Sequence, residues 1–98
     1  MKPVVFHEEA NAEVVDAVRY YDTKAMGLGL SLLLELESAI EEIRHHPEVG
    51  PLISTAIRHK LLRRFPFSLF YAIEPDRIRI LAVGHQRRRP GYWRHRLS

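Results

Sequence analysis

The sequence contains no cysteine, which excludes a disulfide framework and a thiolate metal site. It has no apolar run close to the ~20 residues that a membrane-spanning helix needs. Its first residues, MKPVVFHEEA, turn acidic at once and lack the apolar stretch of a secretory signal. We therefore expect a cytoplasmic protein without a membrane segment. The 98 residues, 46% of them hydrophobic, predict a single globular domain over residues 1–98.

Familiar metal and phosphate motifs are also missing. His7 begins HEEAN, but the zinc-protease motif needs a second histidine where Asn11 stands. His45 and His46 are adjacent, so they point to different sides of a helix. No glycine-rich loop of the P-loop type is present. We expect no metal and no cofactor.

Acidic residues are scarce in the second part of the chain. Residues 58–98 carry 11 Lys and Arg against 2 acidic residues, a balance of +9. Residues 1–57 carry 4 against 10, a balance of −6, and the two parts together give the net charge of +3. Two interpretations remain open: the basic part binds a polyanionic or acidic partner, or the acidic part neutralises it across the fold.

Two amphipathic helices follow a short first strand at residues 3–7. The first helix is expected over residues 8–25, and the second over residues 30–46, where Pro47 ends it. The connection between them, Gly27-Leu28-Gly29, is so short that the two helices should form a helical hairpin. The expected buried faces are Ala10, Val14, Ala17, Val18 and Tyr21 in the first helix and Leu33, Leu36, Ile40 and Ile43 in the second.

Three strands complete the predicted fold, at residues 57–64, 67–74 and 77–83. Their short connections indicate an antiparallel meander, and the middle strand is apolar on both faces, as expected of a central strand. In the last strand, Ile78, Ile80 and Ala82 should face one side. We predict an α+β domain of order βααβββ, with the helical hairpin packed on a small, mainly antiparallel sheet.

Basic residues follow two of these strands. Arg64 ends the first strand of the meander, and His85 and residues 87–89 follow the last, so they should meet at one edge of the sheet. Converging arginines bind phosphate and stabilise developing charge, and His85 or Tyr92 is a candidate general acid or base. This set suits metal-free RNA cleavage. Plainer roles are also open: Trp93 as a cap on the core or a platform for a base, and His85 as a hydrogen-bonded strand end.

Three stretches of the chain resemble one protein family. They are VVFHEEANAEVVDAVRYYD, LGLSLLLELESAIEEIRHHPEVGP and IRHKLLRRFPFSLFYAIEPDRIRILAVGHQRRRPGYW, and the most specific parts of the third are RRFPFSLFY and AVGHQRRRPGYW. Over nearly the whole chain these resemble the RelE/ParE superfamily of bacterial type II toxin–antitoxin toxins, often called plasmid stabilisation proteins. The resemblance implies a curved sheet and a cognate antitoxin whose C-terminal segment wraps the toxin, as a possible heterotetramer, or a toxin homodimer.

The resemblance also implies one of two activities. RelE-like members cut mRNA on the ribosome, and ParE-like members inhibit DNA gyrase without that nuclease set. By position, Arg64 and Arg87 would hold the phosphate, Tyr92 or His85 would move protons, and Lys60 would contact ribosomal RNA. We favour the ribosome-dependent mRNA endonuclease; the alternatives are a gyrase inhibitor and a member that only binds its antitoxin. The remaining expected nucleic-acid contacts are Arg63, Arg88 and Arg89.

The leucine-rich second helix predicts where the antitoxin binds. We expect an apolar helix face of the antitoxin in the groove between hairpin and sheet, against Leu28, Leu32 and Leu36. This prediction requires that these leucines are not already buried in the isolated domain.

Overall fold

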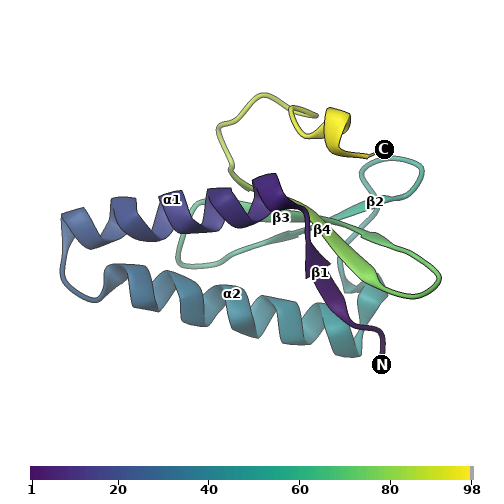
Figure 1. Cartoon of the computed structure of the whole chain (residues 1–98), viewed down its shortest axis with the longest axis horizontal. Helices are drawn as coiled ribbons and strands as arrows, with labels where there is room; N and C mark the ends of the chain where they lie inside the picture. The colour runs from purple at the N-terminus through teal and green to yellow at the C-terminus, as the bar shows by residue number, and fades with distance from the viewer. Residues whose placement is uncertain (98) are drawn as a thin grey trace.

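The computed structural model describes residues 1–97 and shows two layers, a helical hairpin packed on a sheet (Figure 1). The predicted α+β fold and its βααβββ order are confirmed. The elements are β1 Val4–Phe6, α1 Glu8–Lys24, α2 Leu28–His45, β2 Ile57–Leu61, β3 Phe67–Ile73 and β4 Ile78–His85, with short 3-10 helices at Pro47–Val49 and Arg94–Arg96.

The hairpin is defined by local capping. His7 caps α1 by accepting a hydrogen bond from the Glu9 N–H at 3.0 Å, and acidic residues in the first turn suit the helix dipole. Gly27 reverses the chain with φ of 85°, a conformation that favours glycine. The Asp22 carboxylate then accepts the Gly29 N–H at 2.9 Å and holds the start of α2 against the end of α1.

The sheet has the order β1-β4-β3-β2. β2, β3 and β4 form the predicted antiparallel meander, and β3 is central to it. β1 adds to the free edge of β4 in parallel, with Val4 opposite Ile78. The sheet is therefore mixed, and the first strand of the chain depends on the last one for its hydrogen bonds.

A bulge changes the facing of residues in β4. Ala82 pairs with Phe70, but the next pair joins Ile80 to Tyr71, so Leu81 is an extra residue in the strand. Ile80 therefore packs toward the helices, while Leu81 and Ala82 both belong to the cluster on the opposite face. The prediction that Ala82 shares a face with Ile80 is wrong, because strict alternation does not survive a bulge.

Two apolar clusters cover the two faces of the sheet. The main core lies between hairpin and sheet, and it confirms the predicted stripe of α1. The second, smaller cluster is closed by Trp93 from the C-terminal segment, which runs across the face of the sheet away from α2 (Figure 1). In α2 the predicted Leu36 and Ile43 are buried and Ile40 packs against the core, whereas Leu32 and Ala39 are buried in place of Leu33.

Candidate functional site

The loops that follow β2 and β4, which carry the predicted basic residues, lie at one end of the sheet. The end of β2 and the end of β4 both flank the start of β3, with Leu61 opposite Ser68 and His85 opposite Phe67. The Gln86 N–H donates to the Pro66 carbonyl at 2.8 Å and joins the two loops. Arg64 and residues 85–89 thus belong to loops at the same end of the sheet.

A cleft of about 440 Å³ lies between the C-terminal segment and the face of the sheet away from the helices. His85, Arg88, Arg89 and Tyr92 line it, whereas Arg64 and Arg87 do not. Both of those arginines are exposed. The lining of the cleft also includes Trp93, which caps the smaller apolar cluster, and residues that the sequence did not single out, among them Ile53, His59, Leu61, Phe70 and Arg94.

Lys60 is turned away from this cleft. Its Nζ lies 3.0 Å from a carboxylate oxygen of Glu42 on α2. Together with Arg63 it lines a separate hollow of about 280 Å³ at the other side of β2. The backbone N–H groups of Arg63 and Arg64 both donate to the carboxylate of Glu35. Of the predicted set, Lys60 and Arg63 are thus not brought together with the C-terminal residues.

Tyr92 is held by contacts within the chain. Its hydroxyl donates to the Glu13 carboxylate at 2.8 Å, and the guanidinium of Arg88 lies 3.9 Å from the centre of its ring. The ring packs directly on Gly84, where a Cβ would overlap it. Burial, followed by the hydrogen bond to Glu13, raises the pKa of the Tyr92 hydroxyl well above its usual value. The phenol stays protonated at neutral pH and engaged with a carboxylate.

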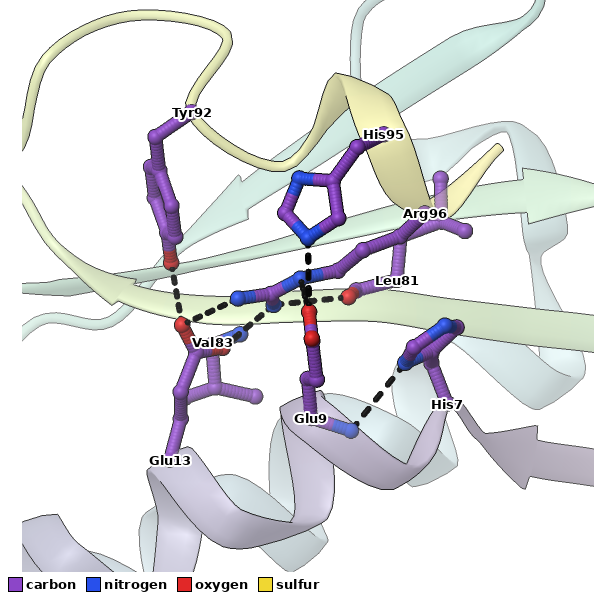
Figure 2. A network of polar contacts seen from close by, with 8 residues as sticks. All are labelled: His7, Glu9, Glu13, Leu81, Val83, Tyr92, His95 and Arg96. Atoms are coloured by element: carbon purple, nitrogen blue, oxygen red, sulfur yellow. Dashed lines mark hydrogen bonds and ion pairs between the residues drawn. The ribbon is translucent and has the colours of Figure 1, made fainter. Parts of the chain in front are cut away.

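Arg96, which the sequence did not single out, is the centre of a buried polar network behind the cleft (Figure 2). It is 6% exposed and makes an ion pair with Glu9 at 2.6 Å through Nε, without hydrogen-bond geometry there. Its Nη atoms contact both oxygens of Glu13, at 2.9 and 3.1 Å. His95 adds a contact of 2.9 Å to Glu9. The spacing of Glu9 and Glu13, four residues apart on one helix face, was the only sequence signal of this network.

The same network completes the edge of β4. β1 covers that edge only as far as Ile80. Beyond it, the Leu81 carbonyl accepts from Arg96 at 3.1 Å and the Val83 N–H donates to Glu13 at 2.9 Å. Buried backbone groups that would otherwise lack partners are thereby satisfied by one acidic and one basic side chain.

The interpretation that the acidic part neutralises the basic part across the fold holds for some of the basic residues. Acidic residues of the first half neutralise some basic residues across the fold, as in the pairs Lys60–Glu42 and Arg96–Glu13. Within residues 1–97, the guanidinium groups of six arginines of the second half have no carboxylate oxygen within 4 Å. They are Arg63, Arg64, Arg87, Arg88, Arg89 and Arg94.

The predicted antitoxin site on α2 is wrong for two of its three leucines. Leu32 and Leu36 are 0% and 2% exposed because they form the core between hairpin and sheet. Leu28 is partly buried against the same core. The exposed leucines of α2 are Leu30 and Leu34, on its outer side.

Neither a metal cluster nor a membrane helix is found in the described part of the chain. Residues 1–97 contain no group of three or more His, Asp or Glu side chains placed to hold a metal ion. Within the same residues, no helix is both long and apolar enough to cross a bilayer.

Residues 4–90 match the family described as "ParE toxin of type II toxin-antitoxin system, parDE". Among solved structures, the fold is similar to a chain of the chromosomal ParDE toxin–antitoxin system from P. aeruginosa, with a TM-score of 0.76 and 18% identity. That similarity covers 87% of this chain and 96% of the other. No curated protein sequence gives a significant match.

Proposed function

The chain belongs to the ParE toxin family of type II toxin–antitoxin systems, and from this premise we propose that it inhibits bacterial DNA gyrase by binding, without cutting RNA. The family implies a cognate antitoxin that neutralises it. The place of action is then the cytoplasm. The observation that carries the proposal is the hydrogen bond of the Tyr92 hydroxyl to Glu13.

RNA cleavage without a metal needs groups that give and take protons at the reacting oxygens. Tyr92 would have to break its bond to Glu13, and its raised pKa makes it a poor proton donor. His85 already accepts the Arg87 N–H at its Nδ1, at 3.0 Å. Lys60 is paired with Glu42. These contacts favour a binding role for the basic end of the sheet.

The unpaired arginines suit such a role. Residues 87–89 are consecutive and exposed, which costs mutual repulsion unless a partner supplies negative charge. Arg63 and Arg64 lie at the same end of the sheet. We propose this basic end as the surface that docks on gyrase, where charge complementarity also speeds association.

Two assays run in parallel test the proposal. Purified gyrase is assayed for supercoiling of a plasmid with increasing amounts of the toxin, and a ribosomal translation extract is assayed for cleavage of its mRNA. We expect supercoiling to be inhibited at concentrations that leave mRNA intact. Cleavage of mRNA, with gyrase unaffected, would establish the endonuclease alternative, and no effect in either assay or on growth would establish a non-toxic member.

A variant pair sharpens the distinction. Arg87→Glu reverses an exposed charge, so we expect it to weaken gyrase inhibition while the fold is unchanged. Tyr92→Phe removes only the hydroxyl, so inhibition should survive in proportion to the folded fraction. If Tyr92→Phe abolished toxicity in a fully folded chain, the proton-transfer role would be supported instead.

A further inference from the structure

The charged side chains that line the cleft beside the C-terminal segment are all basic. Three arginines, Arg88, Arg89 and Arg94, and two histidines line it, and no Asp or Glu does. None of the three arginines has a carboxylate within 4 Å among residues 1–97. Its volume of about 440 Å³ lies in the range of specific binding sites.

The opposite wall of this cleft is apolar and open. Leu61 and Ile53 line it and are 54% and 41% exposed. Leu61 is the last residue of β2, which is an edge strand of the sheet. The outer edge of β2 is hydrogen-bonded near the start of the strand, where the Ile53 N–H donates to the Ile57 carbonyl at 2.8 Å. Exposed aliphatic side chains next to a cationic rim are typical of a protein recognition surface.

The aromatic rings of the cleft are already engaged. Trp93 is 3% exposed and stacks on Phe70 with centroids 5.2 Å apart. The Arg88 guanidinium covers the ring of Tyr92 at 3.9 Å. Proteins that bind single-stranded nucleic acids rely on exposed aromatic rings for base stacking. The cleft offers arginines and aliphatic side chains instead, which fit a peptide.

We propose that this cleft is the docking site for a segment of the antitoxin that carries Asp or Glu together with Leu or Ile. Its carboxylates pair with Arg89 and Arg94, and its aliphatic side chains cover Leu61 and Ile53. The site replaces the one predicted on α2, whose leucines are buried. The inference rests on the toxin–antitoxin assignment and not on gyrase as the target.

The test uses the full chain co-expressed with its antitoxin, purified as the complex and separated for affinity measurements. Arg89→Glu and Leu61→Asp change the cleft. Arg19→Glu on α1 and Leu30→Asp on α2 are matched controls, since Leu30 and Leu61 are 59% and 54% exposed. We expect about tenfold or greater loss of antitoxin affinity for each cleft variant and less than about twofold for each control. Raising the salt concentration should weaken binding of the unaltered chain.

Other results overturn the proposal. If both cleft variants, shown to be folded by circular dichroism, bind the antitoxin as the unaltered chain does, the cleft is not the site. If Leu30→Asp is the variant that weakens binding, the outer face of α2 is the site. If a short oligouridylate binds and Arg89→Glu abolishes that binding alone, the cleft serves nucleic acid.

The gyrase assay keeps this inference separate from the proposed function. If the unaltered chain does not inhibit gyrase but Arg89→Glu loses the antitoxin, the target proposal fails and the docking site stands. If gyrase is inhibited and antitoxin binding is unaffected by the cleft variants, the reverse holds.

Discussion

Arg96 and Glu13 face each other in a two-pronged ion pair, with Nη1–Oε1 at 2.9 Å and Nη2–Oε2 at 3.1 Å. The same carboxylate accepts the Val83 N–H and the Tyr92 hydroxyl (Figure 2). One acidic side chain thus joins α1, β4 and the C-terminal segment. Removing Arg96 would leave the carboxylate of Glu13, whose side chain is 16% exposed, without its bidentate counterion.

Arg96→Met should therefore destabilise the domain. The free energy of unfolding, measured by urea denaturation, should fall by about 2–4 kcal/mol, because Glu13 and the Leu81 carbonyl lose a buried partner. Arg94→Met is the control, since Arg94 is exposed, and should change stability by less than about 0.5 kcal/mol. Equal effects of the two substitutions would mean that the ion pair is not a structural link.

Tyr71→Phe tests a second buried link, between β3 and the loop after α2. The Tyr71 hydroxyl donates to the Pro47 carbonyl at 2.6 Å and accepts the Gly50 N–H at 3.0 Å, and the residue is fully buried. Loss of both bonds should lower the free energy of unfolding by about 1–3 kcal/mol. Both variants are compared by urea denaturation, and Tyr20→Phe, at a residue 55% exposed, should be nearly neutral.

Acid should weaken the contact between α1 and the C-terminal segment. The hydrogen bond from His95, together with the charge of Arg96, holds the pKa of Glu9 below its usual 4.5. A carboxyl whose folded pKa is lowered contributes stability above about pH 4.5 that is lost as the pH falls through the lowered value. Glu9→Gln should therefore flatten the pH dependence of the free energy of unfolding below pH 4.5, and an unchanged pH dependence would contradict this role of Glu9.

Gly84→Ala should disturb Tyr92 in a way that a second substitution reveals. A Cβ at this position would overlap the Tyr92 ring and hydroxyl, so the ring must move away from Glu13. We expect a loss of about 1–3 kcal/mol in the unaltered background. In a Tyr92→Ala background the same change should cost less than about 0.5 kcal/mol, because the clash is gone. Additive losses would contradict the close contact.

The regular elements could be predicted because their residues repeat with the period of the structure. The apolar stripe of α1 identified both the helix and its buried side, and the alternating meander placed Arg64 and His85 at one end of the sheet. The parallel pairing of β1 with β4 left no such periodic signal, because it joins the two ends of the chain.

The details of the site depend on a bulge and on individual ion pairs, which leave no periodic pattern in the sequence. One extra residue at Leu81 moved Ala82 to the other face, and the pairing with Glu42 gave Lys60 an internal role. In the sequence, Arg96 is one of several arginines near the C-terminus and resembles a solvated one. Only the fold shows that it pairs with Glu13. Choosing which of several like charges is buried requires knowledge of tertiary contacts.

The parallel pairing of β1 with β4 also sets the order in which the toxin matures during its synthesis. The two helices of the hairpin are adjacent in sequence and can pair early, whereas β1 finds its partner only when residues 78–80 have been made. Arg96 must follow before the edge of β4 and the wall of the cleft are complete. The basic end of the sheet and the wall of the cleft therefore take their final form only when the last residues of the chain have been added.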